Sequence, residues 1–411
     1  MRIGIASPVT MAALLPYLDP ESAEKGKMFA GMKAPAVDAL ISGLLDAGHQ
    51  LTVFTLDLDV KRPEILTGKN LKVYIGKYRR NGRGGGYRRA ATFFRSEIKQ
   101  LRSFICQEAA NLDILHAHWS YEYAIAGLGA GLPMCVTFRD FAPAILKLRP
   151  DFYRFMRLLM NRYVVSKRCC YQAIANSCYM RDLLMNKWGL DSVVIPNPIH
   201  PDGVIAEADL PETRQNRRII SISNGWGQRK NIETLLEAFA LLRKEMPDAQ
   251  LELVGGSFHR GNSGTERIFQ DHPEWTENVI FAGQIPHSAL GAEIRKSSLL
   301  MHPSREESFG NILLEAMGQG IPAIGGENSG AVPDVLDHGK AGILCDIDDP
   351  AAIKEAMLKL LADENLWRQY SRAGYEHLKE NFMLDKIIAQ TLEVYERTTA
   401  AVKDGNAAHG K

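Results

Sequence analysis

Two glutamates eight positions apart, Glu307 and Glu315, frame the stretch of this sequence whose residue types most clearly suggest chemistry. Pro303 and Gly310 lie in the same stretch, and both disfavour one continuous helix through it. We therefore expect Glu307 in a loop and Glu315 about two turns into a helix that begins at Asn311. The two carboxylates would then reach different parts of one extended ligand.

The start of this expected helix forms a candidate anion site between the two carboxylates. The first N–H groups of a helix have no partner within it, and here they belong to the backbone from Phe309 to Ile312. A nucleotide sugar would place hydroxyl groups near Glu307, a phosphate at the turn and its ribose diol near Glu315. The alternative, that both glutamates are solvated or capping groups, stays open on these residues alone.

The composition is that of an ordinary soluble protein. The 411 residues are 45% hydrophobic and 24% charged, and the formal net charge is +1. A chain of this length exceeds what one hydrophobic core usually organises, so we expect two domains. Near-neutral charge argues against nucleic acid as a partner. Lysine and arginine nevertheless dominate the segment 61–102.

The six cysteines show neither the spacing of metal ligands nor that of a secreted disulfide framework, which predicts a reducing, cytoplasmic location. The first residues lack the apolar stretch of a signal peptide. No uncharged apolar run approaches the roughly 20 residues of a membrane span. Any membrane contact is therefore expected to be peripheral, at the inner face.

Short β-branched runs alternate with amphipathic helical patterns along the chain. Between Pro35 and Ala47, for example, apolar residues recur with helical spacing. Strands separated by helices predict parallel βαβ units, and a polar stretch from Pro201 to Arg218 interrupts the alternation. We interpret that stretch as a linker between domains.

This alternation predicts an α/β protein with two doubly wound, Rossmann-like domains. The first is expected at residues 1–200 and the second at 201–384, with a disordered tail at 400–411. Ligands in such sheets bind beyond the carboxyl ends of the strands, so the site is expected in the cleft between the domains.

Further motifs follow one another along the chain, and they are Asp113-Ile-Leu-His-Ala-His-Trp119, Thr137-Phe-Arg-Asp140, Ile195-Pro-Asn-Pro198, Lys230-Asn231 and Gly330-Ala-Val-Pro-Asp-Val335. Together with the stretch from Glu307 to Glu315, which looks like an E-x7-E motif, they resemble the GT-B glycosyltransferases of the retaining family 4. The resemblance covers nearly the whole chain. It implies an N-terminal acceptor-binding domain, a C-terminal nucleotide-sugar-binding domain and a final helix, at about 385–399, that crosses back onto the first.

By this resemblance, Glu307 contacts the donor sugar and Glu315 binds the ribose hydroxyls, while the backbone of Phe309, Gly310, Asn311 and Ile312 holds sugar or phosphate oxygens. The nucleotide base is expected near Gly283 and Ile285. Lys230 would neutralise the diphosphate, in agreement with the charge that a departing nucleoside diphosphate develops.

The sequence departs from the family pattern at three places. Gly225 stands where relatives usually carry an arginine, so Arg229 or Arg305 is the candidate for a second positive charge. Gly31 keeps only one glycine of the family's glycine pair near the phosphate. Arg139 replaces the usual histidine before Asp140. These last two residues are expected on the acceptor side, with a strand-end cap as the alternative role of Asp140.

His118 ends an expected strand in the Ala-His region that the family uses near the donor sugar. The resemblance therefore gives it a sugar contact or a transition-state role, with His116 as the competing candidate. A lone histidine is also commonly structural.

The resemblance further implies a retaining reaction in which the leaving diphosphate accepts the proton of the acceptor hydroxyl, so no general base is named. No metal or other cofactor is expected, because Lys230 and the helix N-terminus would replace the metal. Asp57-Leu-Asp59 and Asp346-Ile-Asp348 have the spacing of a metal–diphosphate motif from another fold, but both lie at strand ends and are interpreted as turns.

The basic segment 61–102, with interleaved Tyr78, Tyr87, Phe93 and Phe94, is a candidate surface for anionic lipid or a polyprenyl-diphosphate acceptor. A solvated loop is the alternative. We therefore predict a glycosyltransferase that acts on a glycan or lipid-linked acceptor in bacterial surface polysaccharide or glycolipid synthesis. A nucleotide-sugar epimerase and a catalytically silent sugar-binding scaffold remain alternatives.

Overall fold

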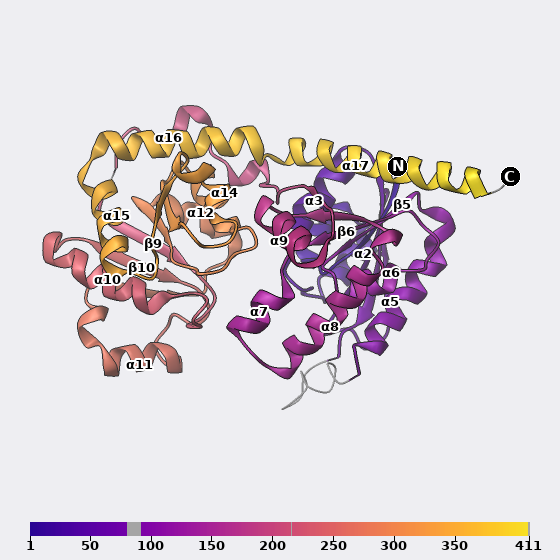
Figure 1. The fold of residues 1–411 in the computed structure, drawn as a ribbon, viewed down its shortest axis with the longest axis horizontal. Coiled ribbons are helices and arrows are strands. Elements are labelled where there is room, and N and C mark those ends of the chain that lie inside the picture. The colour runs from indigo at the N-terminus through magenta and orange to yellow at the C-terminus, as the bar shows by residue number, and fades with distance from the viewer. Residues whose placement is uncertain (80–91, 215, 410–411) are drawn as a thin grey trace. The chain divides into compact units, whose positions relative to one another are not determined.

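The computed structural model describes residues 1–79, 92–214 and 216–409, which form two compact units (Figure 1). Unit 1 comprises Met1–Pro198 together with Leu384–Lys411, and unit 2 comprises Ile199–Met383. The chain crosses between them at two neighbouring points, because Ile199 pairs with Met383 and its N–H donates to the carbonyl of Phe382 at 2.9 Å.

Unit 1 is built on a sheet in which eight strands of the described residues take the order β3-β4-β2-β1-β5-β6-β7-β8. All neighbouring strands are parallel except β3 and β4. All five residues of β6 are buried, as expected for a parallel strand covered on both faces. The strands are β1 (Arg2–Ala6), β2 (Gln50–Asp57), β3 (Glu64–Thr67), β4 (Leu71–Lys77), β5 (Ile114–His118), β6 (Met134–Phe138), β7 (Gln172–Ala175) and β8 (Val193–Val194).

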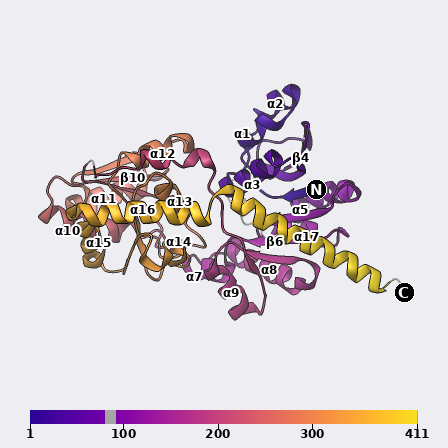
Figure 2. The same ribbon diagram turned by 90° about the horizontal axis from the view of Figure 1, so that it is seen from above.

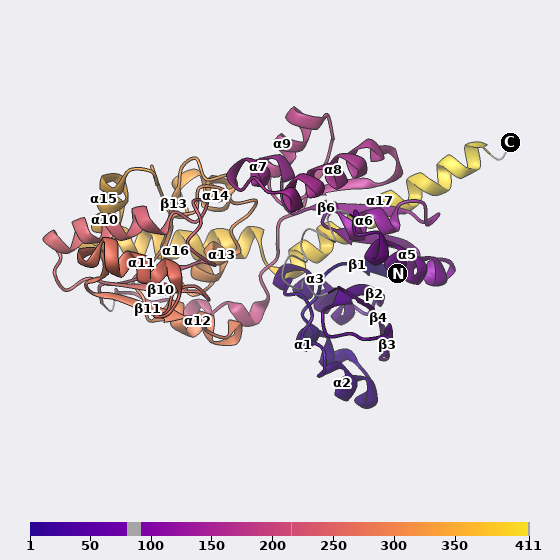
Figure 3. The ribbon, with the colours of Figure 1, turned by 90° about the horizontal axis from the view of Figure 1, so that it is seen from below.

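Helices cover both faces of this sheet. On one face α3 (Pro35–Asp46) and the C-terminal α17 (Leu384–His409) pack together (Figure 2). Figure 3 shows α5 (Arg95–Glu108), α6 (Glu122–Gly127) and α8 (Phe152–Ser166) from the opposite side. The remaining elements of unit 1 are α1 (Met11–Leu14), α2 (Pro20–Gly26), α7 (Ala142–Leu148), α9 (Cys178–Trp188) and the short 3-10 helices Leu15–Tyr17, Ala109–Asn111 and Arg168–Cys170.

Unit 2 has a second, fully parallel sheet in the order β11-β10-β9-β12-β13-β14. The strands are β9 (Arg218–Ile222), β10 (Gln250–Val254), β11 (Val279–Gly283), β12 (Leu299–His302), β13 (Ala323–Gly326) and β14 (Ile343–Cys345). One face is covered by α10 (Ile232–Glu245), α11 (Ser263–Asp271) and α15 (Pro350–Ala362), and the other by α12 (His287–Arg295), α13 (Asn311–Gly318), α14 (Val332–Val335) and α16 (Glu364–Asn381). Short 3-10 helices lie at Pro201–Gly203, Glu207–Asp209, Pro273–Thr276 and Asp337–Gly339.

Each sheet has one point where its strand order reverses direction. In unit 1 it lies between β1 and β5, and in unit 2 between β9 and β12. Connections leave the sheet on opposite faces at such a point, which opens a crevice beyond the carboxyl ends of the two strands. These two strand pairs therefore position the functional loops of each unit.

The predicted fold class, two doubly wound α/β domains, is confirmed, but two local predictions are wrong. The stretch 201–218 is no free linker, because Ile205 donates to the carbonyl of Gly318 at 2.9 Å and accepts from the Tyr375 hydroxyl at 2.9 Å. The predicted disordered tail at 400–411 is helical through His409. Helix α17 therefore continues past the expected end, although Gly405 is a weak helix former.

Candidate functional site

The switch point of unit 2 brings together Lys230 and Glu307, which are far apart in sequence. Lys230 lies in the loop between β9 and α10, just before the N-cap residue Asn231, and Glu307 follows β12. The Lys230 Nζ lies 2.5 Å from Glu307 Oε1 and donates to Ser304 Oγ at 3.2 Å. Both charged side chains are largely buried, with 14% and 15% exposed. A cation is disfavoured beside a helix N-terminus, so Lys230 requires an anionic partner there.

Backbone contacts hold the two loops against each other. Asn231, at a positive φ of 56°, donates its side-chain N–H to the carbonyl of Ile347 at 2.6 Å and so fixes the turn that carries Lys230. The N–H of Arg305 donates to the carbonyl of Arg229 at 2.8 Å. The carbonyl of Glu307 accepts from the N–H of Ala331 at 2.9 Å. The ion pair is therefore built into a rigid loop arrangement.

Arg229, rather than Arg305, adds the second positive charge at this place. Its guanidinium lies 3.5 Å from Glu307 Oε2 and donates to the carbonyl of Glu306 at 3.0 Å. Arg305 instead pairs with Asp348 at 2.6 Å. Gly225 has a positive φ of 99°, a backbone conformation that disfavours the arginine that relatives usually carry there.

The surroundings keep Glu307 ionised. Burial alone would raise the pKa of Glu307, but His302, Lys230 and Arg229 together hold it well below its usual range. His302 Nε2 lies 3.6 Å from Glu307 Oε1. Burial lowers the pKa of Lys230, against the opposing effect of Glu307. The result is a buried carboxylate between cationic groups, suited to accept hydrogen bonds from hydroxyl groups.

The stretch after Glu307 forms the loop and helix that the spacing predicts. Gly310 takes a positive φ of 98° and precedes α13 without a capping side chain, while the ring of Phe309 is buried. Asn311 and Ile312 begin α13, so their backbone lies at its positive end. Glu315 follows on the same helix, half-buried, with Oε1 3.4 Å from His287 Nε2. Oriented N–H groups and a carboxylate thus lie on one short segment.

The two residues predicted near the nucleotide base lie at the carboxyl end of β11. Gly283, at a positive φ of 69°, ends that strand, and Ile285 lies in the loop beyond it. The N–H of Gly283 donates to the carbonyl of Phe258 at 2.7 Å, and its carbonyl accepts from Gly255 at 2.8 Å. These main-chain contacts fix the loop at the carboxyl edge of unit 2.

Gly31 lies in unit 1, between α2 and α3, and pairs with Thr10 in an isolated β-bridge. Its φ is 74°, and a Cβ atom there would come within 2.1 Å of the carbonyl of Val9.

The two Asp-x-Asp pairs use their first carboxylate within the protein. Asp57 accepts from the N–H of Gly31 at 2.6 Å and from the N–H of Asp59 at 2.6 Å. Asp346 likewise accepts from the N–H of Asp348 at 2.9 Å. Both Asp-x-Asp pairs therefore form turns, as expected. In the described part of the chain, no group of three or more His, Cys, Asp or Glu side chains could hold a metal ion.

His116 and His118 lie side by side at the end of β5 but have different surroundings. His116 is bonded through both ring nitrogens, to the Tyr395 hydroxyl and to Thr137 Oγ1, each at 2.7 Å. Burial lowers the pKa of His116 to about 3. Its contact with Tyr395 joins α17 to the sheet, which gives His116 a structural role.

His118 is the histidine with a nitrogen available for a ligand. Its Nδ1 accepts from Arg139 at 3.1 Å, and a guanidinium can only donate, so the hydrogen of the neutral ring is on Nε2. That Nε2 is buried and makes no hydrogen bond to any described residue. Burial, His116 and Arg139 lower the pKa of His118 well below its usual value. His118 is thus a neutral hydrogen-bond donor at neutral pH.

Arg139 is itself held in place by Asn197, which sequence reasoning did not single out as a functional residue. Its guanidinium donates to Asn197 Oδ1 at 2.5 Å and lies 5.6 Å from the ring centre of Trp119. Burial lowers the pKa of Arg139 to about 10. The motifs around residues 118, 139 and 197 therefore form one hydrogen-bonded chain.

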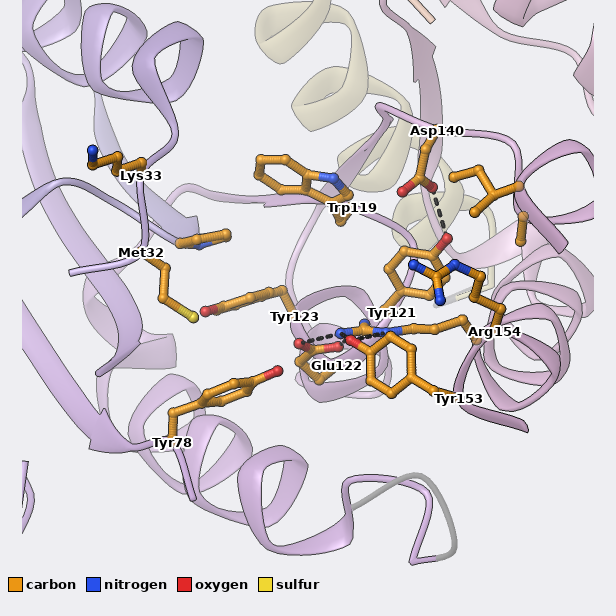
Figure 4. A pocket seen from close by; sticks show the side chains of 14 residues that line it. Met32, Lys33, Tyr78, Trp119, Tyr121, Glu122, Tyr123, Asp140, Tyr153 and Arg154 are labelled. Atoms are coloured by element: carbon orange, nitrogen blue, oxygen red, sulfur yellow. Dashed lines mark hydrogen bonds and ion pairs between the residues drawn. The ribbon is translucent and has the colours of Figure 1, made fainter. Parts of the chain in front are cut away.

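A cavity of about 350 Å³ opens beside Asp140 at the carboxyl edge of the unit 1 sheet (Figure 4). Asp140 accepts from the Tyr121 hydroxyl at 2.7 Å. Sequence reasoning did not place the other lining residues in a site, although it named Tyr78 within the basic segment, and they come from segments far apart in the sequence. The cluster Trp119-Ser-Tyr-Glu-Tyr123 directly after a buried strand was the available signal. The lining residues include Tyr78, Trp119, Tyr121, Glu122, Tyr123, Tyr153, Arg154 and Arg157.

The basic segment 61–102 is only partly a surface feature. Phe94 is fully buried and Tyr78 is 8% exposed, so their predicted role on a lipid-binding surface is wrong. Both rings pack in the cores of unit 1. Residues 80–91, with Tyr87 and the glycine run, lie outside the described residues. No described helix is long and apolar enough to cross a bilayer.

Comparisons with known proteins give matches along most of the chain. The family model Glycosyltransferase Family 4 matches residues 36–202, and the model Glycosyl transferases group 1 matches residues 208–377. N-acetyl-alpha-D-glucosaminyl L-malate synthase of Bacillus anthracis is 27% identical over 72% of this chain and 77% of its own length. Phosphatidyl-myo-inositol mannosyltransferase of Mycolicibacterium smegmatis is 26% identical over 87% of this chain and 88% of its own.

Among solved structures, sucrose-phosphate synthase from Thermosynechococcus elongatus superposes with a TM-score of 0.74 at 20% identity, covering 98% of this chain and 100% of that one. This likeness concerns the fold. None of the three named proteins is an epimerase, so the comparisons give that alternative no support.

Proposed function

Because the chain belongs to the GT-B glycosyltransferases of family 4, we propose that it transfers a sugar from a nucleoside-diphosphate sugar to a hydroxyl acceptor with retention of anomeric configuration and without a bound metal. The observation that carries the proposal is the buried Lys230–Glu307 pair, with Arg229 beside it, at the switch point of unit 2. It combines cations for a diphosphate with a carboxylate for sugar hydroxyls.

In this proposal unit 2 holds the donor. Lys230 and Arg229 neutralise the diphosphate, and the N-terminal backbone of α13 adds partial positive charge. Glu307 accepts hydrogen bonds from sugar hydroxyls, and Glu315 accepts from the ribose. The fixed positive charge acts where the leaving group becomes more negative, so it stabilises the transition state more than the bound donor.

The transfer step breaks the bond between the anomeric carbon and the diphosphate oxygen and forms a bond to the acceptor oxygen. The acceptor enters on the face from which the diphosphate departs, and the diphosphate takes up the proton of the acceptor hydroxyl. The chain supplies position and fixed charge rather than a base. His118 remains a prediction as a hydrogen-bond donor to the donor sugar.

Synthesis of bacterial surface polysaccharide or glycolipid is the setting that we propose. The mannosyltransferase relative is named for phosphatidyl-myo-inositol, a lipid acceptor. A cytoplasmic location at the inner membrane face stays a prediction. So does contact with anionic lipid through the remaining basic residues of 61–102.

The proposal is tested by transfer in the presence of excess EDTA, with product configuration read by NMR. The matched pair is Lys230→Ala, which removes a proposed donor contact, and Lys340→Ala, which removes a lysine that is 79% exposed. We expect a product of retained configuration from the unaltered protein and from Lys340→Ala, and almost none from Lys230→Ala. An inverted product, dependence on added metal, or equal activity of both variants would refute it. A protein that binds the nucleotide sugar without turnover would favour the scaffold alternative.

A further inference from the structure

Two adjacent cysteines that the proposed transfer does not use lie in unit 1, on the short 3-10 helix Arg168–Cys170 between α8 and β7. Both Cys169 and Cys170 are exposed, and their Sγ atoms lie 3.8 Å apart. Side chains of consecutive residues in a helix normally point away from each other. The two thiols therefore form a close pair that is open to a small molecule.

Other cysteines of the chain lack this combination of exposure and a neighbouring thiol. Cys135 and Cys345 are buried, and burial raises the pKa of each thiol to about 12. Cys106 is exposed on α5, but no cysteine stands next to it in the sequence. A cysteine reacts as its thiolate, and only where a reagent reaches it. Cys169 and Cys170 are therefore the cysteines best placed to react as a pair.

The electrostatics of the pair favour Cys169 as the attacking sulfur. The pKa of Cys170 is raised, first because its thiol is hydrogen-bonded to Cys169. Cys170 thus keeps its proton and donates it toward the Cys169 sulfur. Lys167 and Arg168 directly precede the pair, and the sequence has no acidic residue from Phe152 to Cys170. Positive charge of this kind stabilises a thiolate.

A cavity of about 520 Å³ lies beside the two thiols. Its lining includes both cysteines and, from α17, Arg397 and Thr398. Arg397 is 62% exposed, and its contact with Glu393 at 3.8 Å is a surface ion pair, which is a weak interaction. The volume is within the range of about 300–1,000 Å³ that is usual for small-molecule sites. The lining thus combines two thiols with a cation.

We propose that Cys169 and Cys170 are a redox site that reacts with small anionic disulfides at this cavity. The Cys169 thiolate attacks one sulfur of the small disulfide and releases the other half as a thiolate. Cys170 then loses its proton to solvent and attacks the Cys169 sulfur, which releases the second half. The two cysteines lose two electrons and two protons, and the small disulfide gains both electrons and becomes two thiols.

The bond formed between the two cysteines is expected to be easily reduced. Consecutive Cα atoms are about 3.8 Å apart, which is below the range of roughly 4.4–6.8 Å that is usual for disulfides. A bond between neighbouring residues is therefore strained, and strained or exposed disulfides are the labile ones. The pair is a dithiol in reducing surroundings and a disulfide only when small disulfides accumulate.

The test treats the full chain with glutathione disulfide, which is anionic, or with cystamine, which is cationic, and follows the mass of the protein and of its peptides. We expect the unaltered protein to lose the mass of two hydrogen atoms from the peptide with Cys169 and Cys170, and to regain it with dithiothreitol. The reaction should be about tenfold faster with glutathione disulfide, because positive charge attracts the anion. Cys170→Ser should stop at the mixed disulfide on Cys169.

Cys106→Ser is the matched control, because it removes an exposed cysteine that has no neighbouring cysteine, and it should leave the reaction of the pair unchanged. Circular dichroism verifies that each variant is folded. Mixed disulfides on both Cys169 and Cys170 without a bond between them would overturn the proposal. So would a disulfide between two protein chains, equal rates with the two reagents, or a pair that reacts no faster than Cys106.

Discussion

Unit 2 carries Lys230, Arg229 and Glu307 in the loops beyond β9 and β12, whereas unit 1 carries Trp119, Tyr121 and Asp140 beyond β5 and β6. Both sets lie at the carboxyl edge of a doubly wound sheet. The set in unit 2 follows the two strands of the switch point, and the set in unit 1 follows one of those strands and its neighbour. The first is a buried ionic cluster, and the second is a cavity lined largely by aromatic rings, whose two arginines are paired within the protein. The same topology therefore supports two sites of different chemistry, one ionic and one lined largely by aromatic rings.

The two histidines of β5 repeat this contrast at a smaller scale. His116 uses both nitrogens within unit 1, but His118 keeps Nε2–H without a partner among the described residues because Arg139 occupies Nδ1. One neighbour therefore decides which histidine is structural and which can bind. The contrast between the ionic site and the rest of the molecule can be tested in four ways, described in order of decreasing effect.

Glu307→Gln should produce the largest loss. The amide keeps the shape of the side chain but removes the charge that faces Lys230, so we expect transfer to fall by about 10²–10³-fold. Steady-state kinetics with a saturating acceptor measure this. Glu327→Gln, at an exposed position in the same unit, is the control and should retain activity. Near-normal turnover of Glu307→Gln would remove the ion pair from the reaction.

Glu315→Gln should act mainly on donor affinity. Loss of a hydrogen bond to a carboxylate costs about 1.5–3 kcal/mol, so the donor KM should rise by about 10–100-fold while kcat changes less. Glu355→Gln, at a helix position with 64% of the side chain exposed, provides the comparison. An unchanged donor KM would show that the ribose binds elsewhere.

Arg139→Leu should change transfer by at most about tenfold. The residue acts only through His118, whose proposed hydrogen bond to the donor sugar is a single bond between uncharged groups. The sharper readout is 15N NMR of the His118 ring, assigned with a His118→Gln variant. In the unaltered protein we expect a fixed Nε2–H form that does not titrate in the ordinary histidine range, because burial, His116 and Arg139 hold the pKa of His118 well below its usual value. In the variant that pKa should rise. Arg149→Leu, at a 76% exposed side chain, should leave the spectrum unchanged.

The smallest effect concerns stability in acid. The pKa of Glu307 is lower in the folded than in the unfolded chain, so its ionisation stabilises the folded state above the ordinary glutamate pKa of about 4.3. That contribution is lost as the pH falls below this value. The Tm difference between the unaltered protein and Glu307→Gln should therefore shrink from pH 7 to pH 3. A constant difference would mean that the carboxylate is not held ionised by its neighbours.

Local patterns in the sequence were enough to predict most of the fold. Met134–Phe138 is a short, mostly apolar run, Gln250–Val254 begins with alternating polar and apolar residues, and both are strands. The edge strand β3 (Glu64–Thr67) was missed, because its four residues are only partly buried and its antiparallel pairing is not encoded locally. Helix propensity likewise did not predict where α17 ends.

The sites were less predictable, because their geometry depends on contacts between distant residues. Lys230 and Glu307 were both singled out, but the choice of Arg229 over Arg305 required the position of two loops. The tautomer of His118 depends on Arg139, which Asn197 in turn orients. The cavity combines Tyr78, Tyr123 and Tyr153, and no sequence spacing relates them.

Calorimetric titration with UDP, GDP and ADP in metal-free buffer tests the central claim most directly, because it isolates the ionic site of unit 2. One nucleotide should bind with micromolar affinity to the unaltered protein and to the Trp119→Leu variant of unit 1, and its binding should be lost in Lys230→Ala. Binding that requires added metal, or that survives in Lys230→Ala, would contradict the account.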